Sequence, residues 1–144
     1  MFFNYGTSLT KSLSPVKTYD KYFVPIVDDE KNILLSLAYA LKADGVEVIT
    51  CNKSEWAEKA LANYFFDLVI TDVRLSGKSG EEGLEILELI KKKHPKTPVI
   101  VMTAFGSEDV KKKAKSLGVH RFFDKPVDID VLLACIKKLK IPVP

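Results

Sequence analysis

Short runs of β-branched and aromatic residues alternate with longer amphipathic stretches from residue 21 onward. The spacing of apolar positions predicts a strand in each short run and a helix in each longer stretch. The near-continuous apolar run Val99–Met102 is typical of a strand that is buried on both faces. The five predicted strands are Tyr22–Val27, Val46–Thr50, Leu68–Thr71, Pro98–Met102 and Val119–Phe123.

The stretches between the strands carry apolar residues at helical spacing. Four of them have one apolar stripe, and a fifth near Glu81–Lys93 is less one-sided. Ser54 and Ser107 are expected N-caps, while Gly45, Gly118 and His94-Pro95 are expected at helix ends. Parallel strands need crossover connections, so this alternation predicts an α/β fold with a parallel sheet covered on both faces. The four stripes are Ile33, Leu34, Leu37 and Leu41; Ala57, Ala60, Leu61 and Tyr64; Val110, Ala114 and Leu117; and Leu132, Cys135, Ile136 and Leu139.

Length and composition narrow the class of protein. A chain of 144 residues is enough for one domain, and its 47% hydrophobic and 28% charged residues are ordinary for a globular fold. The net charge of +3 is too small to indicate nucleic acid, and no apolar run approaches the roughly 20 residues of a membrane span. No secretory signal is recognisable, and Cys51 and Cys135 are expected to be buried, unpaired hydrophobes. These features predict a soluble, cytoplasmic domain.

Residues 1–20 differ from the rest because they are polar and have no periodicity. We expect a flexible N-terminal leader. The alternative is an arm that docks Phe2, Phe3 or Tyr5 on a neighbouring surface.

Polar residues follow the predicted strands where each strand ends. Asp28, Asp29 and Glu30 follow the first strand, Asp72 the third, Thr103 the fourth and Lys125 the fifth. Taken singly, five of these residues could have purely structural roles. Asp28 or Asp29 could cap the first helix, and Thr103 could hydrogen-bond its own backbone. Asp72 could be an ordinary loop carboxylate, and Lys125 could be a solvated surface charge.

Together these residues indicate a shared site, because ligands bind at the carboxyl ends of parallel strands. Clustered carboxylates repel one another unless a cation joins them. Oxygen ligands without His or Cys favour Mg²⁺ over zinc. A lysine and a hydroxyl beside such an ion are suited to binding phosphoryl oxygens.

These residues resemble the receiver domain of two-component response regulators, through Val27-Asp28-Asp29-Glu30, Asp72, Thr103-Ala104 and Lys125-Pro126. The resemblance covers residues 21–140 and implies a flavodoxin-like, doubly wound (βα)5 fold with sheet order 2-1-3-4-5. It divides the chain into a leader at 1–20, a receiver domain at 21–140 and a short tail at 141–144. Because only four residues follow, the domain is either a stand-alone receiver or, as we expect, a piece of a longer regulator.

The resemblance implies a phosphorylation switch. Asp72 would accept a phosphoryl group from a histidine kinase or a histidine phosphotransfer protein. Asp29 and Asp72 would bind Mg²⁺ directly, Asp28 through water and Arg74 through its backbone carbonyl. Thr103 and Lys125 would bind phosphoryl oxygens, and the Lys125-Pro126 peptide bond would be cis.

Phe122 occupies the position of the family's switch aromatic, although it could also be a plain core residue. The resemblance implies that Thr103 moves inward on phosphorylation and that Phe122 fills the space it leaves. The surface made by the helix near Val110–Leu117, the fifth strand and the last helix would then contact a downstream protein, an output domain or a second copy of the chain. No nucleic acid or membrane contact is implied for this domain.

Two features depart from the family pattern. Pro25 lies in the first strand, where we expect a local kink or a shortened strand. Leu75-Ser76 replace the usual Met-Pro. Residues 77–82 follow them, and Gly83-Leu84 arrive about three positions later than in the family, which predicts a longer and more mobile loop. Arg74 and Phe105 flank the site, and we hypothesise that they gate the water that hydrolyses the phosphorylated form.

Two other functions stay open at this point. One is a pseudo-receiver that binds proteins without being phosphorylated. The other is a Mg²⁺-dependent phosphatase with an aspartyl nucleophile, which is disfavoured because Arg74 stands where such enzymes carry a second carboxylate. A redox flavodoxin is disfavoured because no phosphate-binding Ser/Thr/Gly loop follows the first strand. We therefore expect no enzyme beyond catalysis of its own phosphorylation and dephosphorylation.

Overall fold

A five-stranded parallel sheet forms the centre of the molecule. The computed structural model describes residues 21–52, 59–60, 64–73, 82–104 and 106–144. The strand order is β2-β1-β3-β4-β5, which confirms the predicted order 2-1-3-4-5. Every predicted strand is present, and the largest error is in β5, which begins two residues later than predicted. The strands are β1 (Tyr22–Val27), β2 (Val46–Cys51), β3 (Val69–Asp72), β4 (Val99–Thr103) and β5 (Arg121–Asp124).

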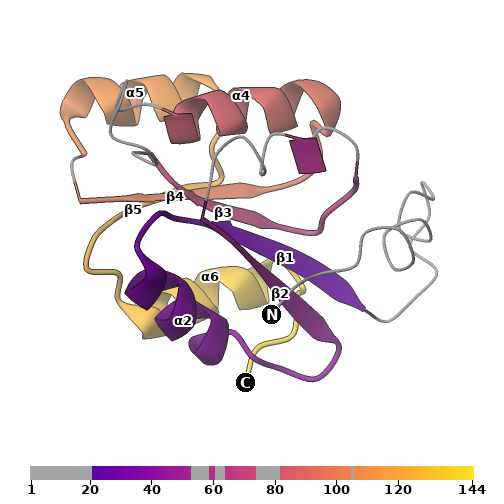
Figure 1. Ribbon diagram of the computed structural model, residues 1–144. Coiled ribbons are helices and arrows are strands. Elements are labelled where there is room, and N and C mark those ends of the chain that lie inside the picture. Colours follow the sequence, from indigo (N-terminus) through magenta and orange to yellow (C-terminus); the bar gives the residue numbers. More distant parts are fainter. Residues whose placement is uncertain (1–20, 53–58, 61–63, 74–81, 105) are drawn as a thin grey trace.

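Helices cover both faces of the sheet, as predicted. The helices α4 (Glu82–Lys93) and α5 (Glu108–Ser116) lie on one face, and α2 (Lys31–Ala40) and α6 (Ile129–Lys138) lie on the other (Figure 1). The predicted helix around Ala57–Tyr64 falls largely outside the described residues, with only Lys59 and Ala60 seen as helical. None of the helices in the described ranges has the length and apolarity needed to cross a membrane.

Each face of the sheet has its own hydrophobic core. Leu34 and Leu37 of α2 pack with Leu132 and Ile136 of α6 on one face, and the apolar residues of α4 pack on the other. All five residues of β4 are buried, which confirms the prediction from its continuous apolar run. Cys51 and Cys135 are buried and unpaired, as expected, and burial raises the pKa of the Cys51 thiol.

The helix ends follow their local sequence signals. The Ser107 side chain accepts a hydrogen bond of 3.2 Å from the Val110 N–H at the start of α5. Gly118 directly follows the C-cap of α5 and has positive φ, which glycine adopts without strain. Gly45 also has positive φ, but it lies in the turn before β2, and α2 already ends at Ala40, so its prediction as a helix end was wrong. Asp128 caps α6 by accepting from the N–H groups of Asp130 and Val131, a cap that the sequence analysis missed. The predicted cap Ser54 lies outside the described residues.

Pro25 was expected to cause either a local kink or a shortened strand, and the second of these two effects is not seen in the pairing of β1 with β2. β1 pairs with β2 without interruption along all six of its residues. Its pairing with β3 is limited to two residue pairs that begin at Ile26. The N–H of Phe23 points to the β3 side, where it donates to Asp67 Oδ2 at 2.9 Å. Alternate residues of a strand face the same neighbouring strand, so Pro25 faces β3 as Phe23 does. The N–H that proline lacks would therefore point towards β3, at a position before the two β1–β3 residue pairs begin.

Candidate functional site

The parallel register brings the ends of β1, β3, β4 and β5 to one edge of the sheet. Asp72 is the last residue of β3 and pairs with Met102, and Thr103 is the last residue of β4 and pairs with Asp124. The Asp28 N–H donates to the Cys51 carbonyl at 3.0 Å, and the Lys125 N–H donates to the Thr103 carbonyl at 2.9 Å. Backbone bonds therefore fix the site residues just beyond the strands.

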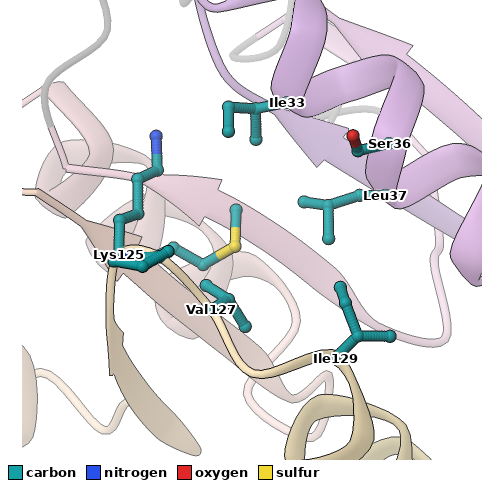
Figure 2. A pocket seen from close by; sticks show the side chains of 8 residues that line it. Ile33, Ser36, Leu37, Lys125, Val127 and Ile129 are labelled. Atoms are coloured by element: carbon teal, nitrogen blue, oxygen red, sulfur yellow. The ribbon is translucent and has the colours of Figure 1, made fainter.

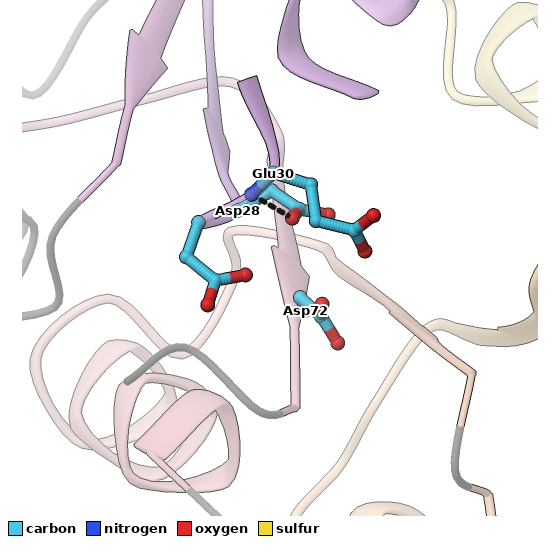
Figure 3. A group of neighbouring side chains, drawn as sticks. Asp28, Glu30 and Asp72 are labelled. Atoms are coloured by element: carbon cyan, nitrogen blue, oxygen red, sulfur yellow. Dashed lines mark hydrogen bonds between the residues drawn. The ribbon is translucent and has the colours of Figure 1, made fainter. Parts of the chain in front are cut away.

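Four carboxylates gather at this edge. Oxygens of Asp28, Asp29, Glu30 and Asp72 lie within 4.8 Å of one another (Figure 3). The Asp28 residue is fully buried and Asp72 is 5% exposed, whereas Asp29 and Glu30 are exposed. The N-cap of α2 is Glu30, and no side chain caps this helix, so the alternative of a capping role for Asp28 or Asp29 was wrong. Asp28 Oδ1 instead accepts from the Glu30 N–H at 2.8 Å.

Lys125 joins three of these carboxylates. Its Nζ lies 2.7 Å from Asp28 Oδ2, 2.9 Å from Asp72 Oδ2 and 3.2 Å from Glu30 Oε1. The lysine side chain is only 8% exposed, so a solvated charge is ruled out, and Asp72 is likewise no ordinary loop carboxylate. The Lys125-Pro126 peptide bond is cis, as the resemblance implied.

Burial and charge shift the acid–base behaviour of the site. Burial raises the pKa of Asp28, although hydrogen bonds from Lys125 and from the Glu30 N–H oppose the shift. Burial, followed by the neighbouring charge of Asp28, raises the pKa of Asp29. Burial alone would lower the pKa of Lys125, but its bonds to Asp28 and Asp72 outweigh this effect and raise it. One ammonium group therefore does not fully stabilise the ionised form of these carboxylates, and a further positive charge would stabilise it.

The donor set fits a divalent cation. Four carboxylates and one ammonium leave an excess of three negative charges when all are ionised. Every candidate ligand atom in this cluster is a carboxylate oxygen, the ligand type preferred by Mg²⁺ and Ca²⁺. The predicted ligands Asp28, Asp29 and Asp72 are brought together, and Glu30 joins them. The predicted ligand Arg74 lies outside the described residues.

We expect Asp29→Asn to stabilise the metal-free protein by about 0.5 kcal/mol at neutral pH, because it relieves repulsion within the cluster. The pKa of Asp29 is raised in the folded state, so its protonation favours folding. The advantage of the variant should therefore shrink as pH falls towards the unfolded-state value of 3.8. Urea unfolding in a chelator, with the exposed Asp44→Asn as control, measures this effect.

Added Mg²⁺ should reverse the order, since the wild type gains more from binding the ion. A metal-free Asp29→Asn protein that is less stable than the wild type at neutral pH would contradict this account of the cluster.

Thr103 and Phe122 both lie close to Gly106. A Cβ added at Gly106 would stand 3.2 Å from Thr103 Cγ2, 3.1 Å from Phe122 Cε1 and 2.8 Å from Asp124 Oδ1. Thr103 is fully buried, whereas Phe122 is partly buried against the core under α4 and α5. The Lys111 ammonium lies 5.8 Å from the centre of the Phe122 ring and pairs with Asp124 at 3.2 Å. The sequence analysis missed Gly106, whose importance depends on contacts distant in the chain.

A cavity of about 220 Å³ adjoins the lysine (Figure 2). Its lining is mostly apolar and comes from α2, β4, the segment after β5 and the first residue of α6, so that Ile33, Leu37, Val127 and Ile129 share this cavity with Lys125. Apolar walls of this kind hold the stem of a lysine while its ammonium reaches a polar site. The loop predicted at residues 76–82 lies outside the described residues except for its last residue, which is the first residue of α4. The proposed gates Arg74 and Phe105 and the leader at 1–20 also lie outside the described residues.

Comparison with known proteins gives a consistent result. The family profile "Response regulator receiver domain" matches residues 24–137. The chain is 34% identical over 113 residues to the DNA-binding transcriptional regulator NtrC of Escherichia coli K12, covering 78% of this chain and 24% of that protein. It thus spans about a quarter of the length of such curated relatives.

Solved structures resemble the fold over most of the chain. A CheY-like receiver domain protein from Methanospirillum hungatei JF-1 has a TM-score of 0.76 and 30% identity, covering 83% of this chain and 94% of that one. The beryllofluoride-activated NtrC4 receiver domain dimer has a TM-score of 0.72 and 32% identity, covering 81% of this chain and 94% of that one.

Proposed function

This chain belongs to the response regulator receiver domains, and we propose that it is switched by phosphorylation of Asp72 in the presence of Mg²⁺. One observation carries the proposal: Lys125 Nζ lies 2.9 Å from Asp72 Oδ2, inside a cluster of four carboxylates at the carboxyl edge of the sheet. This arrangement offers a nucleophilic oxygen, a cation site and a fixed positive charge within one small region.

The reaction is a phosphoryl transfer from a phosphohistidine. An oxygen of Asp72 forms a bond to phosphorus while the bond between phosphorus and the imidazole nitrogen breaks. The imidazole leaves with the electron pair and takes up a proton from solvent. Asp29 and Asp72 would bind Mg²⁺ directly, and Asp28 would bind it through water. The ion would neutralise negative charge on the carboxylates and on the phosphoryl oxygens.

Lys125 and Thr103 act on the transferred group. The Lys125 ammonium is held beside Asp72 by Asp28, so it is in place for a phosphoryl oxygen before the group arrives. Thr103 is the last residue of β4, next to Asp72 at the end of β3, and its hydroxyl would hydrogen-bond another phosphoryl oxygen. Both residues act only on the phosphoryl group that is carried by Asp72. The chemistry that we propose for this domain is therefore limited to formation and hydrolysis of the acyl phosphate on Asp72.

The output of the switch is a change in the surface of α5, β5 and α6. If Thr103 moves towards a phosphoryl oxygen, it leaves space on the Gly106 side, where Phe122 can enter. Lys111 lies over Phe122 and pairs with Asp124, so ring movement would also disturb contacts between α5 and β5. We propose that this surface meets an output domain, a downstream protein or a second copy; the dimeric state of the activated NtrC4 relative supports the last.

The test is intact-mass measurement after incubation with Mg²⁺ and acetyl phosphate. We expect one added phosphoryl group in the wild type and none in Asp72→Asn, because only the carboxylate can form an acyl phosphate. A folded wild type that neither gains the group nor binds beryllofluoride would contradict the proposal and favour a pseudo-receiver. Sustained turnover of a phosphate ester would instead favour a phosphatase.

A further inference from the structure

We propose that Glu30 is a positioning residue for Lys125, which holds one N–H of the ammonium until a phosphoryl oxygen replaces it. This inference rests on the proposed function, because it concerns how Lys125 becomes available to the phosphoryl group on Asp72. It assigns a role to a side chain that is neither the phospho-acceptor nor one of the predicted metal ligands.

Lys125 has a limited number of hydrogen-bond donors. An ammonium group has three N–H donors and no acceptor. Lys125 Nζ contacts three carboxylates in the described part of the chain, at 2.7 Å from Asp28, 2.9 Å from Asp72 and 3.2 Å from Glu30. All three donors are therefore engaged in this structure. A phosphodonor that approaches while Asp72 is still ionised can gain a Lys125 donor only if one carboxylate gives up its bond.

Geometry and burial identify Glu30 as the partner that gives way. Its contact is the longest of the three, and its side chain is 59% exposed, against 0% for Asp28 and 6% for Asp72. Water can hydrate the Glu30 carboxylate once the bond is lost, so the loss costs little. Breaking the bond to Asp28 would leave a buried carboxylate without its cationic partner, which is far more costly.

The backbone of Glu30 makes the experiment selective. Its N–H donates to Asp28 Oδ1 at 2.8 Å, and this bond does not depend on the side chain. Glu30→Gln keeps the backbone bond and the size of the side chain while removing the negative charge. Any change in the variant therefore reports the contact between Glu30 and Lys125, and the charge of Glu30 in the cluster.

Removing this charge should have two opposite effects. The Lys125 donor loses a competitor and an anionic phosphodonor meets less repulsion, so phosphorylation by acetyl phosphate at saturating Mg²⁺ should be about two- to fivefold faster. The cluster also loses one carboxylate, so the Kd for Mg²⁺ should rise about two- to fivefold. If Glu30 had only a structural role, its replacement would not both speed the phosphorylation reaction and weaken the binding of Mg²⁺.

A readout without metal isolates the contact itself. In the metal-free protein, the NMR signal of the Lys125 ammonium should show faster hydrogen exchange in Glu30→Gln than in the wild type, because the neutral amide oxygen of glutamine holds the N–H less strongly than the carboxylate does. Glu88→Gln is the matched control, since Glu88 is an exposed residue of α4, on the other face of the sheet, and the substitution removes the same charge. It should leave the ammonium signal, the Mg²⁺ affinity and the reaction rate unchanged.

The outcomes separate this inference from the proposed function. If the wild type is phosphorylated and Glu30→Gln reacts at the wild-type rate or more slowly, the role of Glu30 is wrong and the proposed function stands. If the wild type is not phosphorylated, the proposed function is wrong, and the ammonium exchange in the metal-free protein still tests the contact. Unchanged ammonium exchange in Glu30→Gln would overturn the inference.

Discussion

Replacing Lys125 by methionine is expected to lower the free energy of unfolding by about 3 kcal/mol at neutral pH, because it leaves buried carboxylates without their cationic partner. Asp28 and Asp72 contact the ammonium at 2.7 Å and 2.9 Å, and both side chains are almost fully buried. Methionine retains most of the apolar stem that lines the cavity beside α2. The loss therefore reports the charge, and it is measured by urea unfolding in a chelator.

The loss should depend on pH in a defined direction. The pKa of Lys125 is raised in the folded state, so its contribution is present below the unfolded-state value of 10.5 and disappears as pH rises through the folded-state value. The pKa of Asp28 is also raised by burial, and it rises further without the lysine bond. Protonation of Asp28 then relieves the unpaired charge, so the deficit of Lys125→Met should shrink as pH falls towards the unfolded-state value of 3.8 for this carboxyl.

Lys112→Met provides the control, since Lys112 is an exposed lysine of α5 away from the carboxylates. It should change the free energy of unfolding by only a few tenths of a kcal/mol. A Lys125→Met protein as stable as the wild type at neutral pH would show that the lysine does not hold the carboxylate cluster together.

Replacing Gly83 by alanine is expected to cost about 3 kcal/mol and to impair phosphorylation, because this glycine lies against the backbone of the phospho-acceptor. An added Cβ would overlap with the Asp72 carbonyl oxygen and would stand 2.7 Å from Val73 Cα. The Gly83 N–H also donates to the Val73 carbonyl at 2.8 Å, so the start of α4 is fixed to the end of β3. Relief of the clash must move backbone at the site itself.

The matched control is Glu85→Ala, an exposed position on the same helix, which should be nearly neutral. Urea unfolding gives the stability, and the acetyl phosphate reaction gives the effect on the site. A Gly83→Ala protein with wild-type stability and reaction rate would contradict the close packing of α4 on β3.

The sheet could be predicted from the sequence because each strand is a short run rich in β-branched or aromatic residues and most of the helices carry one apolar stripe. It also predicted the edge at which Asp28, Asp72, Thr103 and Lys125 meet, because parallel strands share the direction of their carboxyl ends. The strand order itself came from the family resemblance. The observed strand order therefore confirms the family resemblance, and it does not confirm a prediction made from the apolar pattern.

Contacts that depend on how the elements pack could not be predicted. The role of Gly83 depends on the approach of α4 to β3, and the role of Gly106 depends on its position between Thr103 and Phe122. The contact of Glu30 with Lys125 joins residues 95 positions apart. The effect of Pro25 could not be predicted because its outcome depends on which neighbouring strand its missing N–H would face.

The most direct test of the central claim is to locate the phosphoryl group after reaction with acetyl phosphate and Mg²⁺. Borohydride reduces an aspartyl phosphate to homoserine, and peptide mass mapping then identifies the modified residue. Our account predicts homoserine at position 72 alone, and none in Asp72→Asn. Homoserine at position 28 or 29 in the wild type, or an unmodified Asp72 in a protein that has gained a phosphoryl group, would contradict it.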